Sequence, residues 1–402
     1  MKNILALISV FALSATVYGQ SVTLSLKNTS GKEVVDYTAE FSTAKLKHLP
    51  VGQLIAVVDG ETVPVEFIRN IDGEEKIVFP IAAFKADETK KAVLKAGSAD
   101  KYPKRTYAEL AHKIGGHFEG TKYVGGYSWV KPNYLRVPDN FRDHAYYIKY
   151  EGPGWESDKA AFRFYLDQRN AIDVFAKKTP QIVLPFVGVD GYDSYHEMAD
   201  WGMDNTNVGK ALGLGSIASW DGKQAVRVEK TDSVICYIPA DGKIRSQVMT
   251  VYYGWDAGSV KTTLRSLISI DAGSRASHVE LKTDRPVLNL ATGINKDART
   301  EFFYRNEKGE KWSYIASFGL QSLNKDNQGL AVFVRTAQLK EITSDALNHI
   351  VLLQPDKTGY ADYYILPTWE LDWQPVVTKD DFIRCIDEVL ARLNSIELRI
   401  EN

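Results

Sequence analysis

Short runs of β-branched and aromatic residues recur from about residue 224 to residue 366, and glycine-containing turns separate them. The turns lie at Asp221-Gly222, Asp241-Gly242, Lys308-Gly309 and Lys357-Thr358-Gly359. Short strands joined by tight turns, with few helices between them, are typical of antiparallel sheets rather than of alternating βαβ units. The pattern therefore predicts a large antiparallel β-sandwich or barrel.

A smaller β unit is expected ahead of this region. Apolar residues alternate with Ser and Thr over residues 22–26, and Asp59-Gly60 separates two apolar runs in the manner of a hairpin. A polar stretch at residues 96–100 then interrupts the pattern. We expect a mostly β fold class, with a small β-sandwich over residues 21–98 and the large domain over residues 101–402.

The large domain is expected to end in a helix. Thr378 is a good N-cap residue, and Asp380 and Asp381 favour the first turn of a helix. One apolar stripe follows at helical spacing, and it is formed by Phe382, Ile383, Ile386, Val389, Leu390 and Leu393. The simplest position for this helix is against the sheet.

The first twenty residues predict export. Lys2 precedes an apolar run from Ile4 to Leu13, and Val17-Tyr18-Gly19 has the form of a cleavage site before Gln20. A membrane span needs about 20 apolar residues, so this run is too short, and no later segment lacks charges over that length. No cysteine follows the apolar run as a lipid-anchor site. The expectation is a periplasmic or secreted protein with a signal over residues 1–20 and no membrane span.

Composition narrows the class of partner. A net charge of -2 argues against nucleic acid, whose phosphates require a basic surface. The 21 Tyr and 8 Trp favour a carbohydrate instead, because such rings stack on sugars while their polar tips form hydrogen bonds. No phosphate-binding loop, nucleophile elbow or cysteine-rich metal spacing occurs, and no cofactor is expected. Cys236 and Cys385 are expected to be free buried thiols rather than a disulfide.

One predicted strand carries a polar face. Alternation places the side chains of Arg163, Tyr165, Asp167 and Arg169 on the same side of the strand. Arginine binds carboxylates with two parallel hydrogen bonds, so Arg163, Arg169 and Asp167 are candidate substrate-binding residues, and Tyr165 is a candidate base. A solvated sheet face with ion pairs would explain the same pattern.

The turn at residues 152–158 supplies further candidates. Glu156 could act as a catalytic acid or base, and Trp155 could form the floor of a sugar subsite, although an ordinary hairpin tip has the same sequence features. His144 precedes this turn and is a candidate catalytic residue. His112 and His117 flank Gly115-Gly116, and His117 is a candidate for lining a cleft.

Residues 192–212 show a helical pattern interrupted by glycine. On a helix His196, Asp200 and Asp204 would form one stripe, so His196 and Asp204 are candidate catalytic residues and Trp201 is a candidate sugar-binding residue. A metal could bind the same stripe, but no second histidine follows at metalloprotease spacing. The ligands of any metal therefore stay undefined, and charges on the surface of a helix remain an alternative.

Three segments together resemble a family of secreted bacterial proteins. They are Tyr150-Glu-Gly-Pro-Gly-Trp-Glu-Ser-Asp158, Phe164-Tyr-Leu-Asp-Gln-Arg-Asn170 and Ser194-Tyr-His-Glu-Met-Ala-Asp-Trp-Gly-Met-Asp204. The family is domain of unknown function 4861, and the resemblance covers most of residues 21–395. It implies a role in the processing of pectin-like or other uronate-containing glycans and assigns no catalytic residues.

A second resemblance concerns residues 248–282. Their long paired strands are similar to galactose-mutarotase-like super-sandwiches, an architecture shared by sugar epimerases and many polysaccharide lyases. The catalytic His and Glu of mutarotases have no counterpart here.

These observations leave three hypotheses open. The first is a lyase or hydrolase acting on uronate-containing oligosaccharides. A lyase would use Arg163 or Arg169 to hold the carboxylate and His196, His144 or Tyr165 as the base. A hydrolase would use Glu156 and Asp204. The second hypothesis is a glycan-binding protein without catalysis, and the third is a structural protein of the cell envelope.

Overall fold

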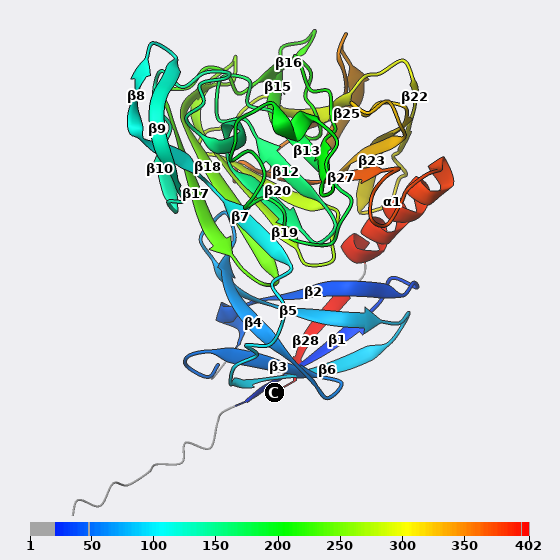
Figure 1. The fold of residues 1–402 in the computed structure, drawn as a ribbon. Coiled ribbons are helices and arrows are strands. Elements are labelled where there is room, and N and C mark those ends of the chain that lie inside the picture. Colours follow the sequence, from blue (N-terminus) through cyan, green and yellow to red (C-terminus); the bar gives the residue numbers. More distant parts are fainter. Residues whose placement is uncertain (1–20, 47–48, 395, 402) are drawn as a thin grey trace, which may run out of the picture.

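A computed structural model describes residues 21–46, 49–394 and 396–401 (Figure 1). The predicted secretory signal lies outside the described residues. Two β domains make up the described chain, and a single α-helix lies near its C-terminal end. The predicted mostly β fold class with a C-terminal helix is confirmed.

The small domain is one seven-stranded sheet that folds over its own core. Its strand order is β2-β5-β4-β3-β6-β1-β28. Leu24 on β1 and Phe41 on β2 belong to the same buried cluster although their strands lie near opposite ends of the sheet, so the sheet forms a sandwich. The strands are β1 (Val22–Asn28), β2 (Val34–Ser42), β3 (Leu54–Val58), β4 (Glu61–Arg69), β5 (Glu75–Phe84), β6 (Thr89–Ala96) and β28 (Ile396–Glu401).

The last strand of the chain belongs to this small domain. β28 pairs antiparallel with β1, and Ile400 lies opposite Leu24. The prediction that residues 396–401 belong to the large domain is therefore wrong, because a boundary drawn from local composition cannot detect a strand that returns to the first sheet. The chain therefore passes from the small domain to the large domain and back.

A nine-stranded antiparallel sheet forms the base of the large domain. Its order is β10-β17-β18-β19-β20-β27-β24-β23-β22. The strands are β10 (Tyr134–Arg136), β17 (Ser233–Asp241), β18 (Arg245–Asp256), β19 (Lys261–Asp271), β20 (Ser277–Thr283), β27 (Tyr360–Trp369), β24 (Gln328–Arg335), β23 (Trp312–Gly319) and β22 (Thr300–Arg305).

Two five-stranded sheets cover one face of the nine-stranded sheet. The first has the order β14-β13-β12-β11-β7 and the second β16-β15-β21-β26-β25. The strands are β14 (Gly202–Asp204), β13 (Ile172–Lys177), β12 (Ala161–Phe164), β11 (Gly154–Ser157), β7 (Thr106–Glu109), β16 (Ala225–Arg227), β15 (Ala218–Trp220), β21 (Leu290–Asn295), β26 (Asn348–Leu353) and β25 (Leu339–Ser344). A separate hairpin consists of β8 (His112–Glu119) and β9 (Lys122–Val130).

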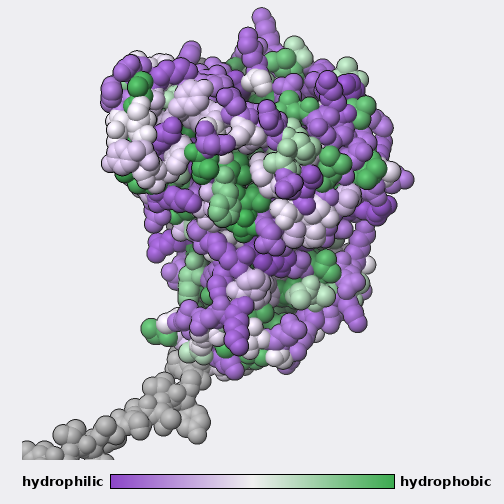
Figure 2. All heavy atoms as spheres, in the orientation of Figure 1, coloured by the Kyte–Doolittle hydropathy of each residue, from purple (hydrophilic) through white to green (hydrophobic). Residues whose placement is uncertain are grey.

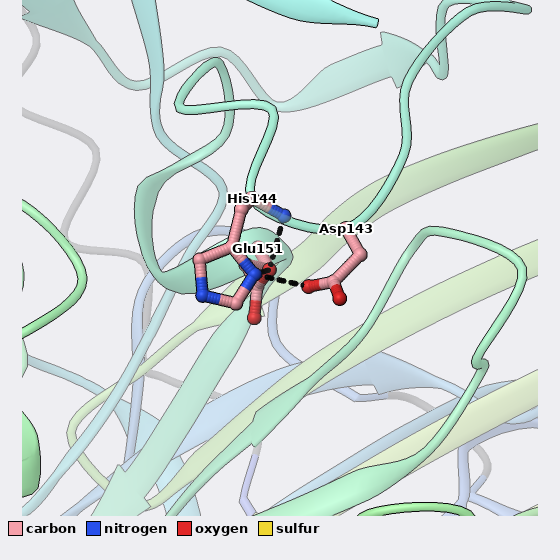
Figure 3. Close-up of side chains that lie close together, drawn as sticks. All are labelled: Asp143, His144 and Glu151. Carbon is pink, nitrogen blue, oxygen red and sulfur yellow. Dashed lines mark hydrogen bonds and ion pairs between the residues drawn. The ribbon is translucent and has the colours of Figure 1, made fainter.

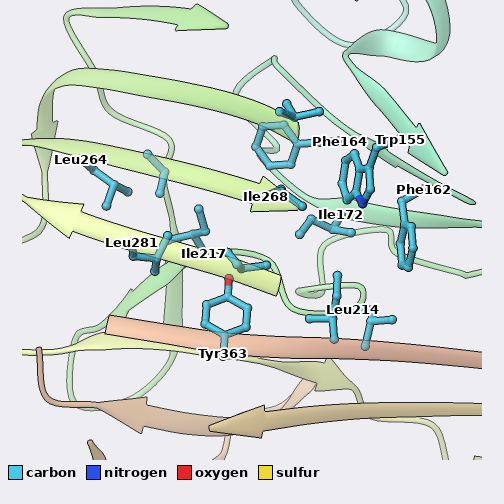
Figure 4. Packing of buried hydrophobic residues seen from close by; sticks show 14 of the residues in the cluster. Trp155, Phe162, Phe164, Ile172, Leu214, Ile217, Leu264, Ile268, Leu281 and Tyr363 are labelled. Atoms are coloured by element: carbon cyan, nitrogen blue, oxygen red, sulfur yellow. The ribbon is translucent and has the colours of Figure 1, made fainter. Parts of the chain in front are cut away.

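The main core lies between these sheets (Figure 4). Trp155 on β11 and Phe162 on β12 stack at 5.3 Å between ring centroids, in the same cluster as Ile268 on β19. The indole N–H of Trp155 donates to the Ser277 hydroxyl oxygen at 2.9 Å. Trp155 is only 1% exposed, so it is a core residue and cannot form the sugar floor that the sequence suggested.

The other face of the nine-stranded sheet is covered in part by α1 (Lys379–Asn394). Ile315 points into the main core, whereas its neighbour Ala316 contributes to the cluster that contains Phe382 of the helix. The helix begins as predicted, because the Asp381 backbone N–H donates to the Thr378 hydroxyl oxygen at 3.2 Å. No described helix is long and apolar enough to cross a membrane.

The predicted helix over residues 192–212 is wrong. This segment contains a single 3-10 turn, η3 (Ser194–His196), followed by β14. Gly202 has φ of 130°, a conformation outside any helix, and it leads the chain into pairing with β13. Cys236 and Cys385 are free thiols, as expected, but only Cys236 is buried, and Cys385 is partly exposed.

Candidate active site

The candidate active site lies on the outward face of the five-stranded sheet β14-β13-β12-β11-β7. Phe162 and Phe164 of β12 point into the core, so Arg163 between them points to the opposite face. Arg163 lies directly opposite Asp173 on β13. Residues 143–151 and 183–201 cover this face and contribute the remaining polar groups.

Arg163 occupies the centre of the site and is buried. One guanidinium nitrogen, Nη2, donates to Asp173 Oδ2 at 2.9 Å and to Asp204 Oδ2 at 2.5 Å. The other, Nη1, contacts the Tyr195 hydroxyl at 2.9 Å and Glu151 Oε2 at 3.3 Å. Only 3% of this side chain is exposed, so Arg163 positions protein groups and cannot bind a substrate carboxylate directly.

The carboxyl of Asp173 and the phenol of Tyr165 share this buried environment. Tyr165 donates its hydroxyl hydrogen to Asp173 Oδ2 at 2.6 Å. Burial, together with the neighbouring Asp204, raises the pKa of Asp173 to about 7. Burial also raises the pKa of Tyr165 well above its usual value, which keeps the phenol protonated and makes Tyr165 a poor general base.

His196 is the accessible member of a histidine–carboxylate pair. Its Nε2 lies 3.3 Å from Asp204 Oδ2, and its side chain is 42% exposed while that of Asp204 is 1% exposed. The hydrogen bond to Asp204 raises the pKa of His196 above its ordinary value. Asp204 Oδ1 has no hydrogen-bond partner within the described chain. An exposed imidazole oriented by a buried carboxylate can accept or donate a proton.

His144 and Glu151 form a second histidine–carboxylate pair (Figure 3). His144 Nδ1 lies 2.5 Å from Asp143 Oδ1 and 4.0 Å from Glu151 Oε1. The backbone N–H of His144 donates to Glu151 Oε1 at 3.0 Å. His144 is 48% exposed and Glu151 4%, so this imidazole also faces solvent above a buried carboxylate.

The segment that carries His144 has an unusual backbone. His144, Tyr146, Tyr150 and Glu151 have φ values of 56°, 60°, 36° and 70°, and they are four of the nine described non-glycine residues with positive φ. Such conformations cost about 1–3 kcal/mol each and persist only where the surroundings enforce them. The surrounding contacts therefore fix the direction of His144.

Asp143, His144 and Glu151 offer three potential metal-ligand atoms within 4.8 Å of one another. The Arg169 guanidinium lies 2.8 Å from Asp143 Oδ1 and 2.6 Å from Glu151 Oε1. A divalent cation bound to these oxygens would face like-charge repulsion from Arg169. The guanidinium already balances these carboxylates, so the donor set fits a metal poorly.

Arg169 is fully engaged by protein groups. It binds both oxygens of Asp167, with the shortest contact at 2.6 Å, and its guanidinium stacks over the Tyr165 ring at 4.1 Å. Arg163, Tyr165, Asp167 and Arg169 do lie close together, but the strand predicted for them ends at Phe164 and residues 167–170 form a turn, so strand alternation accounts for Arg163 alone. The structure shows in addition that the two arginines bind neighbouring carboxylates, which leaves neither guanidinium open to a ligand in this arrangement.

Arg227 on β16 is a cation that the sequence analysis missed. Its Nη1 donates to the Ala211 carbonyl oxygen at 3.2 Å, and no carboxylate of the described chain forms an ion pair with it. Burial lowers the pKa of Arg227; Glu229 opposes this effect and the nearby Arg169 adds to it. A half-buried arginine without a carboxylate partner, beside Arg169, suits an anionic ligand group. A lone arginine in a short strand gives no sequence signal of this role.

Glu156 is separated from the histidines. Its carboxylate binds Lys177 Nζ at 2.8 Å and accepts the Leu184 N–H at 2.7 Å, and both charged side chains are 0% exposed. The register Glu156–Ala161–Phe175–Asp204 places three strand spacings between the two carboxylates. Glu156 therefore anchors residues 183–184 instead of facing a substrate.

The other predicted residues lie at the margin. Trp201 packs edge-on against Phe175, with 5.9 Å between ring centroids. His117 lies on the β8–β9 hairpin, is 70% exposed and contacts Glu119 at 3.2 Å. Asp200 is exposed and does not continue a stripe with His196 and Asp204, because the segment is not helical.

Aromatic rings border the two histidines. Tyr146 stacks on Tyr192 at 4.8 Å, and His144 meets the edge of the same Tyr192 ring. Trp129 of the β8–β9 hairpin donates its indole N–H to the Val189 carbonyl oxygen at 3.1 Å, which ties the hairpin to the covering segment. Phe186 in that segment is 77% exposed. These rings give the site surfaces on which a sugar ring can stack.

Fold and site together define a two-domain antiparallel β protein with two histidine–carboxylate pairs on the outward face of a small sheet. The chain belongs to the family described as domain of unknown function (DUF4861), whose model matches residues 26–396. The resemblance noted from the three sequence segments is thereby confirmed. No curated protein matches the chain.

Two solved structures are similar over most of this chain. An α-mannosidase from Enterococcus faecalis V583 has a TM-score of 0.46 at 8% identity, covering 95% of this chain and 46% of its own. A glycosyl hydrolase family 38 protein from Enterococcus faecalis has a TM-score of 0.43 at 8% identity, covering 95% and 47%. The chain spans about half the length of these proteins.

Proposed function

We propose that this protein is an exported carbohydrate-active enzyme that cleaves uronate-containing oligosaccharides by β-elimination, as polysaccharide lyases do. The observation that carries the proposal is the half-exposed imidazole of His196 oriented by the buried carboxylate of Asp204. Arg227, which lies beside Arg169 and has no carboxylate partner among the described residues, would supply the cation that this chemistry also requires.

In the proposed reaction, His196 removes the proton on the carbon α to the uronate carboxylate. The electron pair forms a carbon–carbon double bond as the bond to the glycosidic oxygen on the next carbon breaks, and that oxygen takes a proton from His144. Arg227 binds the carboxylate and stabilises the negative charge that develops on it. The products are one sugar with an unsaturated ring and one with a restored hydroxyl group.

The site geometry favours elimination over hydrolysis by the carboxylates proposed from sequence. Strands lie roughly 4.8 Å apart, so three spacings separate Glu156 from Asp204 by about 14 Å. Retaining and inverting hydrolases need about 5–10 Å between their carboxyl groups. Glu156 is also enclosed by Lys177 and two backbone N–H groups.

Uronate oligosaccharides from pectin and ulvan, incubated with the purified protein, provide the test. Ultraviolet absorbance of the unsaturated product and product masses are recorded together. We expect His196→Ala to reduce the initial rate about 100-fold or more, the usual contribution of a positioned base. His117→Ala is the matched control, because His117 is exposed and lies on the separate hairpin.

Arg227→Ala should raise KM and lower kcat, since it removes the group that binds the carboxylate and stabilises its developing charge, and Arg299→Ala on the surface should change neither. If the products together are heavier than the substrate by one water molecule and do not absorb in the ultraviolet, the protein is a hydrolase and not a lyase. Binding without any product would support a glycan-binding protein instead.

Export is part of the proposal and rests on residues 1–20 alone. Expression of the full chain in a Gram-negative host should give a periplasmic protein whose N-terminus lies near Gln20. An intact N-terminus in the cytoplasmic fraction would contradict it.

A further inference from the structure

A separate cleft lies between the two domains. Its volume is about 310 Å³, within the range of small-ligand sites, which often occur at domain interfaces. The small domain contributes Tyr37 and Glu40, the nine-stranded sheet contributes Gln247 and His278, and α1 contributes Arg392. Figure 1 shows the small domain and α1 against the same end of the large domain. Much of the surface near this junction is hydrophilic in Figure 2.

The floor of this interdomain cleft is one row of side chains across four neighbouring strands. Gln247 on β18 lies opposite Ser269 on β19, Ser269 opposite His278 on β20, and His278 opposite Tyr364 on β27. The adjacent residues Val248, Ile268 and Val279 point into the main core. The row therefore belongs to the outward face of the nine-stranded sheet, and the core separates it from the candidate active site.

Gln247 presents an unused hydrogen-bond acceptor to this cleft. Its amide nitrogen donates to the Arg69 carbonyl oxygen and to the Ser269 hydroxyl, each at 3.1 Å. The carbonyl contact fixes the orientation of the amide, because only the NH₂ group can donate. The amide oxygen is buried and has no hydrogen-bond partner among the described residues, and Gln247 is 1% exposed. A buried acceptor of this kind needs a donor from a ligand or water.

Aromatic side chains line the same cleft. The rings of His278 and Tyr364 stack at 4.2 Å with an interplanar angle of 8°. Asp362 orients this ring, because its Oδ2 lies 3.0 Å from Nε2 of His278. Tyr37 and Tyr360 add two further rings. Flat rings beside hydrogen-bonding groups match a sugar, which offers both C–H faces and hydroxyl groups.

The charges of the cleft are largely paired within the protein. Arg245 binds Asp271 at 2.6 Å and also Glu40. Arg335 pairs with Asp362. Arg392 instead donates to backbone carbonyl oxygens, including that of Asp36 at 3.1 Å. Glu280 forms no ion pair among the described residues and accepts the Tyr360 hydroxyl hydrogen at 3.4 Å. Its negative charge and the positive charge of Arg392 are of opposite sign, so the cleft has little net charge and a neutral ligand fits better than a charged one.

We propose that the interdomain cleft is a second saccharide-binding site, which takes one or two neutral sugar units. A sugar hydroxyl donates to the Gln247 amide oxygen, and a sugar face lies against an aromatic ring of the lining. The site does not depend on the chemistry at His196. It can hold a neutral part of a glycan while a charged part is processed elsewhere.

Titration calorimetry of the mature protein with galactose, rhamnose, xylose and lactose tests the proposal, together with crystals soaked in the same sugars. We expect at least one sugar to bind, with a hydroxyl at the Gln247 amide oxygen. Gln247→Leu should weaken this binding about 3- to 10-fold, the effect of one hydrogen bond, and Tyr364→Leu, which removes an aromatic ring of the lining, should also weaken it.

Two control variants show whether sugar binding depends on the cleft itself. Gln328→Leu removes another buried glutamine whose amide oxygen is unpartnered, but Gln328 does not line the cleft, so sugar affinity should be unchanged. His196→Ala should also leave it unchanged, which keeps this test independent of the proposed lyase activity. Absence of binding by all four sugars, or equal affinity in both cleft variants and wild type, would overturn the proposal.

Discussion

Arg163 connects the two histidine–carboxylate pairs although it faces no solvent. Its two terminal nitrogens contact Glu151, which lies beneath His144, and Asp204, which lies beneath His196. Burying several charges is costly unless each is paired, and here one guanidinium pairs with carboxylates on both sides. One buried side chain therefore contacts both of the carboxylates that lie next to the exposed imidazoles.

The pH dependence of turnover should report the Asp204–His196 hydrogen bond. The bond raises the pKa of His196 above 6.5, and the base must be neutral, so kcat/KM should rise as pH increases through that raised pKa. Asp204→Asn removes the carboxylate and should move the midpoint to lower pH.

The measurement is kcat/KM against pH for wild type, Asp204→Asn and the control His117→Ala, with circular dichroism to verify folding. An Asp204→Asn midpoint that stays in place or moves up would rule out this assignment of the base.

The Glu156–Lys177 pair should be structural. Lys177→Met leaves the Glu156 carboxylate buried without its cation, which should lower the free energy of unfolding by about 3–5 kcal/mol. The double variant Glu156→Gln/Lys177→Met should recover part of that loss, because no charge remains buried. Chemical denaturation of the two variants and wild type gives the comparison. Equal stability of Lys177→Met and wild type would show that the Glu156–Lys177 pair does not stabilise the fold.

Among the secondary-structure elements, α1 owes its position to its apolar stripe and to one glycine in the sheet. A Cβ atom at Gly329 on β24 would lie 2.5 Å from the Phe382 ring, so the ring occupies the space above that glycine. Phe382 is 0% exposed and contributes to the cluster between helix and sheet. The helix is thus attached by shape complementarity as well as by hydrophobicity.

Phe382→Ala should detach or loosen this helix. Loss of a buried phenylalanine costs about 3–5 kcal/mol, whereas Arg384→Ala on the exposed side should cost about 0.5 kcal/mol or less. Denaturant midpoints of both variants test this. A midpoint for Phe382→Ala as high as that of Arg384→Ala would mean that the helix contributes little to stability.

Across the molecule as a whole, strands from both ends of the chain meet in one sheet. Six residue pairs join β1 and β28, so the small domain is incomplete without the C-terminal strand. The large domain lies between these strands in the sequence. Folding of the small domain therefore depends on residues separated by nearly the whole chain, which are slow to find one another.

A truncated variant that ends at Asn394 should have a less stable small domain. Removing β28 makes β1 an edge strand and deletes several hydrogen bonds of about 1 kcal/mol each, so amide exchange in β1 should accelerate at least about tenfold. Amides of β23 and β24 in the large domain serve as the internal control. Unchanged exchange in β1 would show that β28 does not stabilise this sheet.

Local patterns in the sequence were enough to predict most of the elements. Alternating polarity predicted many of the strands, a stripe at helical spacing predicted α1, and the i, i+2 rule placed Arg163 on the face opposite Phe162 and Phe164. Residues close in the chain carry all of these patterns. The same reasoning failed for residues 192–212, where glycine conformations and pairing with β13 replaced the helical periodicity.

The accessibility of each polar residue, by contrast, depends on tertiary contacts. Asp204 contacts Arg163 across 41 residues of sequence, and Arg245 contacts Glu40 across 205. Such contacts bury Arg163 and enclose Glu156, and within the described part of the chain they leave Arg227 without a carboxylate partner. Burial and pairing involve segments far apart in the chain, whereas sequence periodicity reports only which way a side chain points from its own strand or helix.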